Sequence, residues 1–272
     1  MLRAWQDVVS KWQLVPDEVE GEPDDARESF DRARSALVEG RLDESLEGFR
    51  KAATGRRHPH DQVGMGDVHL ARGRWRAAAE HYERALTLDP DDTLAQLGRA
   101  MLLVAQGKAT LAVEKLEPMV AHRPDDPVLR YYLASAWCSV AEQCRSQTVD
   151  EVLVITSEHQ LRICERAAKR IVELDVDDEE LNRGATRLLA EVVAGRRWSW
   201  APEGVAVSLA VLAMSLGLTM VVAGGALDSA GLVVAGVLVG AALLYLIVLR
   251  FRRQAWQQRA ETLGPTIAKP GV

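Results

Sequence analysis

Residues 60–92 have the sequence HDQVGMGDVHLARGRWRAAAEHYERALTLDPDD. Its apolar residues recur three and four positions apart, the spacing that places them on one face of an α-helix. Gly73 divides the stretch into two such helices, and Pro90 ends the second because proline cannot continue a helix. Gly66 and Ala78 are small enough to let the two helices touch. The stretch therefore predicts a packed pair of helices.

The same pattern returns at a fixed distance along the chain. Gly107 follows Gly73 by 34 residues. Pro124 follows Pro90 by the same interval. Upstream, Gly40 precedes Gly73 by 33 residues, although that unit ends in GRRHPH without a proline at the corresponding place. A period of this length indicates stacked structural repeats.

With these residues at this period, the chain resembles the tetratricopeptide repeat family. The resemblance covers roughly residues 26–195 and is strongest in the two middle repeats. It implies an all-α solenoid of about four helix pairs plus a capping helix, because each repeat buries its apolar face only against its neighbours. We place the capping helix at residues 179–195, leading into the C-terminal part of the chain.

The fourth repeat departs from the family pattern. Its first helix begins at Pro127, but its second helix starts only near Ser157. We therefore expect an insert over about residues 146–157, with a β-leaning stretch at residues 152–155. A long loop in place of a tight turn is typical of a functional or interface-forming segment.

The resemblance also implies a binding surface. In this family, the first helices of successive repeats line a concave groove that receives a peptide or helix. The matching positions here are mostly apolar, which suits an amphipathic or extended apolar segment. The same side chains could instead pack against neighbouring helices, and the sequence leaves both interpretations open. The positions are Phe30, Arg34, Leu37, Val63, Asp67, Leu70, Leu94, Leu97, Met101, Val104, Tyr131 and Cys138.

Residues 1–15 are a candidate ligand within the chain itself. Their apolar side chains recur at helical spacing and form a stripe that a free helix would not keep exposed. This helix could dock in the groove, bind another protein or lie on a membrane, and the last is disfavoured because Arg3 and Lys11 are its only basic residues. An acidic linker, residues 16–25, would tether it. The stripe consists of Leu2, Trp5, Val8, Val9 and Trp12.

Two segments near the C-terminus predict a transmembrane hairpin. Residues 204–227 and 229–249 carry no charge, and about 20 apolar residues suffice to cross the hydrocarbon core. Only Asp228 separates them, whereas arginines precede the first and a basic tail, residues 250–272, follows the second. The positive-inside rule then places both termini and the repeat domain in the cytosol. An N-terminus without an apolar secretory core agrees with this orientation.

Composition narrows the class of protein further. Arginine outnumbers lysine 27 to 6, a bias typical of GC-rich bacterial genomes, so we expect the bacterial inner membrane. The net charge of −6 disfavours a nucleic-acid-binding protein. Three cysteines without paired spacing indicate neither a disulfide framework nor a zinc module. We interpret His58, His60 and Asp61 as a surface turn rather than a metal site.

No motif pairs a nucleophile with a base or separates an acid from a base, so we expect neither an enzyme nor a cofactor. The sequence predicts a membrane-anchored adaptor or scaffold that binds a protein partner through its groove on the cytosolic side. The alternative is a self-assembling structural membrane protein, in which the N-terminal helix docks into the groove of another copy. Small residues in the two spans would then pack copies together in the bilayer.

Overall fold

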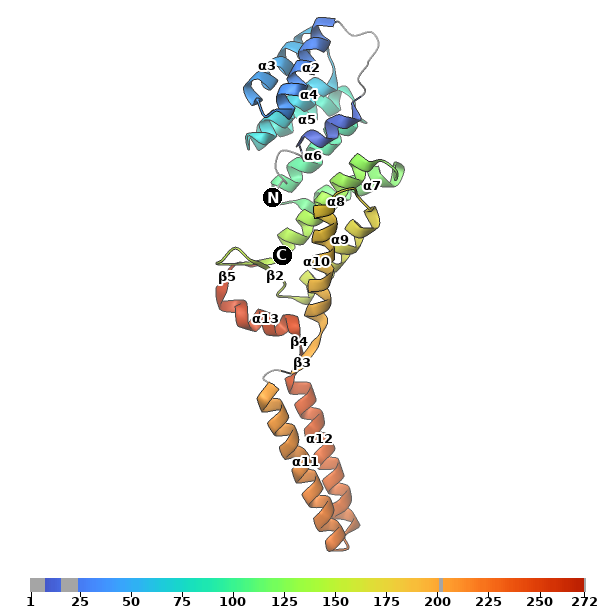
Figure 1. Ribbon diagram of the computed structural model, residues 1–272, viewed down its shortest axis with the longest axis vertical. Coiled ribbons are helices and arrows are strands. Elements are labelled where there is room, and N and C mark those ends of the chain that lie inside the picture. Colours follow the sequence, from blue (N-terminus) through green and yellow to red (C-terminus); the bar gives the residue numbers. More distant parts are fainter. Residues whose placement is uncertain (1–7, 16–23, 201–202, 272) are drawn as a thin grey trace. The chain divides into compact units, whose positions relative to one another are not determined.

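The computed structural model describes residues 8–15, 24–200 and 203–271. Helices dominate this part of the chain, as the all-α prediction required (Figure 1). The chain divides into two compact units, one made of the residues up to 144 with 163–188 and the other of 145–162 with the residues from 189 onward. The predicted stripe residues Leu2 and Trp5 and most of the predicted linker lie outside the described residues.

Consecutive helix pairs form the repeat region. They follow a short 3-10 helix, η1 (Ser10–Leu14), and a final helix, α10 (Glu179–Arg196), comes after them as predicted. The pairs are α2 (Asp24–Val38) with α3 (Leu42–Gly55), α4 (Pro59–Ala71) with α5 (Trp75–Leu88), α6 (Thr93–Ala105) with α7 (Ala109–His122), and α8 (Pro127–Cys144) with α9 (Glu158–Leu174).

Glycines in left-handed conformation make the turns within the first three pairs. Gly40, Gly73 and Gly107 have φ of +77°, +68° and +77°, a region where other residues are strained. In the second pair, the N–H of Gly73 donates to the carbonyl of Leu70, and the next N–H donates to the carbonyl of His69. These bonds satisfy carbonyls that the helix end leaves open. The glycine period in the sequence therefore reflects one turn geometry used three times.

The helices approach closely where glycine faces an aromatic ring. Tyr82 is fully buried, and a Cβ atom on Gly66 or Gly98 would lie 2.6 or 2.4 Å from its ring carbon Cε1. Phe49, also fully buried, lies in the same way against Gly64. Because these glycines have no side chain, the rings can lie directly against their backbone. This close contact sets the packing of neighbouring helices.

The fourth repeat contains more structure than the predicted loop. Within the second unit, β1 (Ser146–Thr148) pairs antiparallel with both β2 (Leu153–Val154) and β5 (Ile267–Lys269), in the order β2-β1-β5. The C-terminal tail thus pairs with the insert. This pairing could not be predicted from the sequence, because strands so far apart along the chain carry no shared local pattern.

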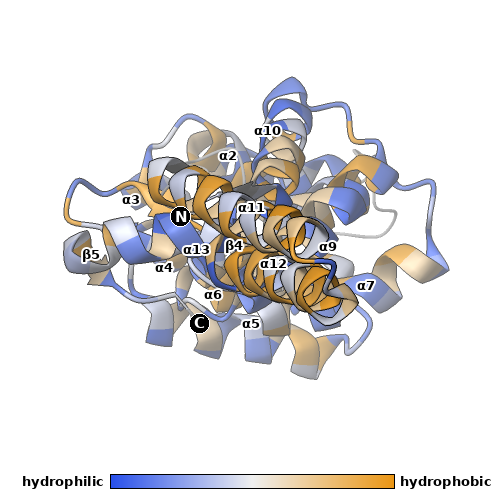
Figure 2. Cartoon of the chain, turned by 90° about the horizontal axis from the view of Figure 1, so that it is seen from below, coloured by the Kyte–Doolittle hydropathy of each residue, from blue (hydrophilic) through white to orange (hydrophobic). Residues whose placement is uncertain are grey.

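Two long apolar helices, α11 (Glu203–Ala226) and α12 (Ala230–Phe251), pack against each other (Figure 1). Hydrophobic residues predominate on both helices, with paler, less apolar residues between them (Figure 2). Both are long and apolar enough to cross a membrane. A second small sheet, β3 (Trp198–Trp200) with β4 (Arg252–Gln254), joins the start of α11 to the end of α12, and α13 (Ala255–Leu263) and η2 (Gly264–Thr266) follow.

Candidate functional site

Residues 8–15, here called the N-terminal segment, are packed into the repeat region of their own chain. The side chains of Val8, Lys11, Trp12 and Val15 are buried, while Gln13 is exposed. The predicted α-helix tightens into the 3-10 turn η1 over its last residues, a common ending that brings neighbouring side chains closer together. As a result, two consecutive residues, Lys11 and Trp12, both point into the repeats.

Asp67, in the middle of α4, receives both of these side chains. The Nζ of Lys11 lies 2.6 Å from its Oδ1, and the Nε1 of Trp12 donates to its Oδ2 at 2.9 Å. The hydroxyl of Tyr82 donates to Oδ1 at 2.7 Å. Both the carboxylate and the ammonium are withdrawn from water, with side-chain exposures of 0% and 2%. This arrangement is a charge-assisted hydrogen-bond network, the strong class of such contacts.

Two tyrosines complete the surroundings of Lys11. The hydroxyl of Tyr132, on α8, accepts the backbone N–H of Lys11 at 3.0 Å. The ammonium also lies 5.1 Å from the ring centroid of Tyr82, within the range of a cation–π contact. We call Asp67, Tyr82 and Tyr132 the Asp67 site. This site therefore binds both the ammonium group and the backbone N–H of Lys11.

The indole of Trp12 occupies an aromatic slot formed by Phe30, Phe49 and His60. Its ring stacks on Phe49 at 5.9 Å between centroids and meets Phe30 edge-on at the same distance. His60 lies edge-on at 6.4 Å. Offset and edge-to-face pairs are the arrangements that aromatic rings favour, so the slot adds to the burial energy of the indole.

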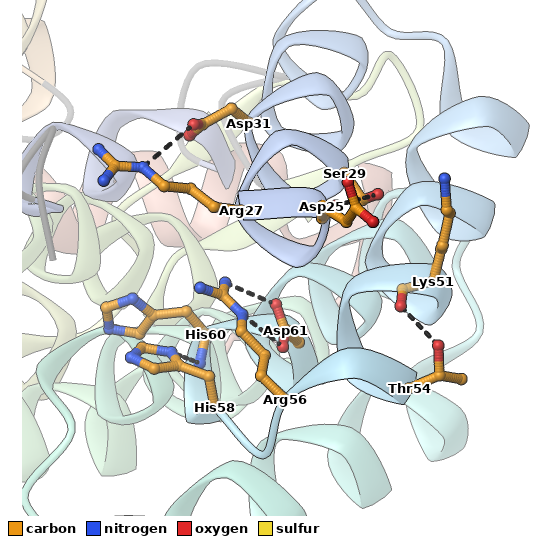
Figure 3. Close-up of polar contacts among 10 residues, drawn as sticks. All are labelled: Asp25, Arg27, Ser29, Asp31, Lys51, Thr54, Arg56, His58, His60 and Asp61. Atoms are coloured by element: carbon orange, nitrogen blue, oxygen red, sulfur yellow. Dashed lines mark hydrogen bonds and ion pairs between the residues drawn. The ribbon is translucent and has the colours of Figure 1, made fainter. Parts of the chain in front are cut away.

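A buried ion pair next to the aromatic slot packs against one of its rings. Arg56 lies 4.7 Å from the ring of Phe30 and forms an ion pair with the buried carboxylate of Asp61 at 2.9 Å. Figure 3 shows this guanidinium directed at both oxygens of Asp61, with the rings of His58 and His60 beside it. These residues are therefore engaged in packing, and the described residues contain no cluster of three potential metal ligands.

Asp92 fixes the ring of His60 and the start of α6. Its Oδ2 lies 3.0 Å from the Nε2 of His60, and its Oδ1 accepts the N–H of Ala95 at 2.7 Å. Burial would raise the pKa of Asp92, but the hydrogen bonds from His60 and Ala95 outweigh it and hold the pKa below its usual value. Asp92 therefore remains a carboxylate that caps the helix.

At the Asp67 site, in contrast, burial has the larger effect on the pKa of the carboxyl group. Desolvation raises the pKa of the Asp67 carboxyl even though the charge of Lys11 and the hydrogen bonds from Lys11, Tyr82 and Trp12 pull it down. The pKa of Tyr82 is raised by burial and by the adjacent carboxylate, so its hydroxyl stays a donor. A buried carboxylate needs a positive partner and full hydrogen bonding. The repeats alone supply only Tyr82, and the N-terminal segment supplies the rest.

Most of the predicted groove positions are withdrawn from solvent. Leu97 and Met101 on α6 belong to the main hydrophobic core, together with Phe30, Leu37, Val63, Leu70, Leu94 and Val104. Arg34, Tyr131 and Cys138 are partly exposed. The N-terminal segment covers Asp67. The apolar positions predicted to line the groove therefore also pack against neighbouring helices. Sequence reasoning named Asp67 but missed Tyr82 and Tyr132, whose only visible signal was a buried aromatic position.

A pocket of about 800 Å³ remains beside the N-terminal segment. Residues of the segment itself line it, together with residues from the end of α2 and from α8 and with Asp178, which directly precedes α10. The N-terminal segment therefore leaves open space beside it. The pocket is lined by Val9, Ser10, Trp12, Gln13, Val15, Arg34, Ser35, Val38, Glu39, Tyr131 and Asp178.

Comparison with known proteins agrees with the repeat pattern. Residues 63–137 match the model of the tetratricopeptide repeat family. A solved structure of MamA (41-end) from Desulfovibrio magneticus RS-1 is similar, with 20% identity, a TM-score of 0.44 and coverage of 64% of this chain and 96% of that one. A tetratricopeptide-repeat protein from Bacteroides fragilis NCTC 9343 has 13% identity, a TM-score of 0.36 and coverage of 89% and 93%. No curated protein matches this chain.

The matched region begins in α4, which carries Asp67, and ends in α8, which carries Tyr132. The Asp67 site is thus built on helices that the family model recognises. Together with the glycine turns at Gly73 and Gly107, this match shows that residues 63–137 form tetratricopeptide repeats.

Proposed function

We propose that this chain is an adaptor anchored in a bacterial inner membrane, and that its repeat groove binds a segment of a protein partner on the cytosolic side. The observation that carries the proposal is the contact between Asp67 and two consecutive residues of the N-terminal segment, Lys11 and Trp12. The repeats hold a peptide segment by charge, main-chain hydrogen bonding and aromatic stacking. These are the contacts by which one protein recognises a short segment of another.

The membrane part of the proposal is supported by the surface of the hairpin. Large apolar side chains such as Leu212, Leu218 and Leu238 are more than 60% exposed. Proteins that stay in water rarely expose continuous apolar surface of this extent. Trp198 and Trp200 lie exposed at one end, where amphipathic rings favour the lipid headgroups.

The anchor and its orientation are tested by labelling single cysteines in intact bacterial spheroplasts. All three native cysteines are first replaced by serine, and a cysteine is then introduced as Asp228→Cys or as Lys269→Cys. A maleimide that does not cross membranes should label the first variant in intact spheroplasts and the second only after lysis. Extraction of the full chain by alkaline carbonate, or labelling of both sites only after lysis, would contradict the proposed hairpin.

Partner binding is tested by photo-crosslinking in native membranes. A photoreactive residue at Val38, which is exposed and lines the pocket beside the N-terminal segment, should crosslink to a defined protein. The matched control is Leu111, similarly exposed on α7 and absent from that pocket. Equal products at both positions would indicate that the groove is not the binding surface.

Self-assembly is a second candidate, favoured by the fact that the chain's own N-terminal segment fits the groove. The same contacts could form between two copies if the segment left its own groove. Size measurement of the full chain in detergent, with and without residues 1–15, separates the candidates. Loss of an oligomer on truncation supports self-assembly, whereas an unchanged monomer supports a foreign partner.

A further inference from the structure

We infer that the groove recognises a lysine followed directly by a tryptophan in its partner, and that the N-terminal segment occupies this site until such a partner displaces it. The inference rests on the proposed function of the groove as a binding site. It adds the chemistry of the partner and the identity of the competitor. Four features of the Asp67 site and its surroundings lead to it.

The first feature is that one carboxylate contacts two adjacent residues. Lys11 uses Oδ1 of Asp67 and Trp12 uses Oδ2, so each oxygen is matched to a different side chain. The tight turn of η1 directs both side chains to the same side. A segment with the two residues separated would not bring both the ammonium and the indole N–H to this carboxylate, so spacing is part of the recognition.

The second feature is selection for positive charge. Asp67 is fully buried, and the described residues within hydrogen-bonding reach of it include one cation, Lys11. An apolar residue in place of the lysine would leave a buried charge without a partner, which is strongly unfavourable. The ring of Tyr82 adds a second surface that attracts a cation. The site therefore favours a lysine over an uncharged side chain of equal length.

The third feature is selection for an indole. Phe30, Phe49 and His60 surround the ring of Trp12 and would accept any flat aromatic side chain. Tryptophan also presents an N–H at the edge of its ring, which donates to Oδ2 of Asp67 at 2.9 Å and which phenylalanine lacks. Phenylalanine would fill part of the slot and leave this oxygen without its donor.

The fourth feature makes exchange possible. The pocket of about 800 Å³ runs along the N-terminal segment and reaches Trp12 itself. A partner can therefore bind beside the segment before replacing it. Lys11 and Trp12 belong to the same chain as the groove, so they compete at a high effective concentration. Binding of a partner should be weak while they are in place and should strengthen when they are removed.

The test uses a fluorescent peptide with the sequence of residues 8–15, VVSKWQLV, and the full chain in detergent. The chain is studied as wild type and as the double variant Lys11→Ala/Trp12→Ala, which weakens the internal competitor. Fluorescence anisotropy should give an affinity at least about tenfold higher for the double variant, a difference that is readily resolved. A chain lacking residues 1–15 serves as a second vacated form if the double variant does not fold.

Peptide variants test the chemistry. Lys11→Met keeps an unbranched side chain one atom shorter but removes the charge, and Trp12→Phe keeps an aromatic ring but removes the donor. Each should bind the double variant at least about tenfold more weakly than the parent peptide. Gln13→Ala is the control, because this side chain is exposed and should change binding less than about twofold. Adding Asp67→Asn to the chain should abolish the difference between the parent and Lys11→Met peptides.

The outcomes separate this inference from the proposed function. Equal binding of the parent, Lys11→Met and Trp12→Phe peptides would overturn the lysine–tryptophan recognition and leave the groove as a binding surface. No binding of any peptide to a vacated chain that circular dichroism shows to be folded would overturn both. Equal affinity of wild type and vacated chain for the parent peptide would overturn the role of the N-terminal segment as competitor.

Discussion

The ammonium of Lys11 and the carboxylate of Asp67 form a 2.6 Å ion pair across 56 positions of sequence, with both groups buried. The lysine precedes the first repeat, and the aspartate lies in the second. Lys11, which lies outside the repeat pattern, therefore supplies the counter-charge for the buried Asp67 of the repeat region. Most consequences for stability and binding follow from this pair.

Asp67→Asn should release the N-terminal segment. The asparagine can still accept a hydrogen bond, but it leaves the ammonium of Lys11 buried without a counter-charge, a loss of about 3–5 kcal/mol if the segment stayed in place. Because leaving the groove returns the lysine to water, we expect faster hydrogen exchange at residues 8–15 while the repeats stay protected. The control is Asp43→Asn, at a fully exposed carboxylate on α3. Unchanged exchange in Asp67→Asn would contradict the role of the pair.

Gly66→Ala and Gly98→Ala should each destabilise the repeats. A new Cβ atom would lie 2.6 or 2.4 Å from the ring of Tyr82, which is buried and cannot move away freely. Overpacking of this kind costs about 1–3 kcal/mol in the free energy of unfolding. Urea unfolding of the full chain in detergent measures it.

Gly184→Ala is the matched control for these variants. It lies inside α10, and nothing stands within 4 Å of a Cβ atom added there. Alanine favours the helix over glycine by up to about 1 kcal/mol, so this variant should be as stable as the wild type or more stable. A loss of stability in Gly184→Ala equal to that in Gly66→Ala would show that the effect is not steric.

The stability of the repeats should fall in mild acid because of His81. Burial, together with the neighbouring His69, Arg84 and Arg50, lowers the pKa of His81 from 6.5 to about 4. Between these values the unfolded chain binds the proton more readily than the folded chain, so stability is present above pH 6.5 and is lost as the pH falls toward 4. His81→Gln should make the pH dependence shallower. Parallel curves of unfolding midpoint against pH for the two proteins would rule out this contribution.

Substitution of two adjacent glycines near the end of α11, Gly224 and Gly225, should affect the stability of the hairpin differently. A Cβ atom on Gly224 would lie 2.7 Å from the backbone nitrogen of Val233 on α12, whereas nothing lies within 4 Å of one on Gly225. Gly224→Val should therefore push the two helices apart and lower the thermal midpoint of the full chain in detergent. Gly225→Val should leave it nearly unchanged. Equal effects of the two substitutions would mean that the helices do not pack as described.

Local patterns made the repeats and the apolar helices readable from the sequence alone. Glycine at the turns, helical periodicity and a charge-free run of residues act within one or two helices, so each leaves a signal at short range. Gly73 and Gly107 marked their turns correctly for this reason. Asp67 was recognised as a groove position because its place in the repeat template implied it.

Tertiary structure alone decided what those elements contact. The sequence leaves three destinations open for the N-terminal segment. In the folded chain Lys11 and Trp12 of this segment contact Asp67, where a buried carboxylate requires a cation and further donors. The pairing of the C-terminal β5 with β1 in the insert was invisible for the same reason. Contacts between distant residues depend on which partners meet after chain closure, and no local period records that.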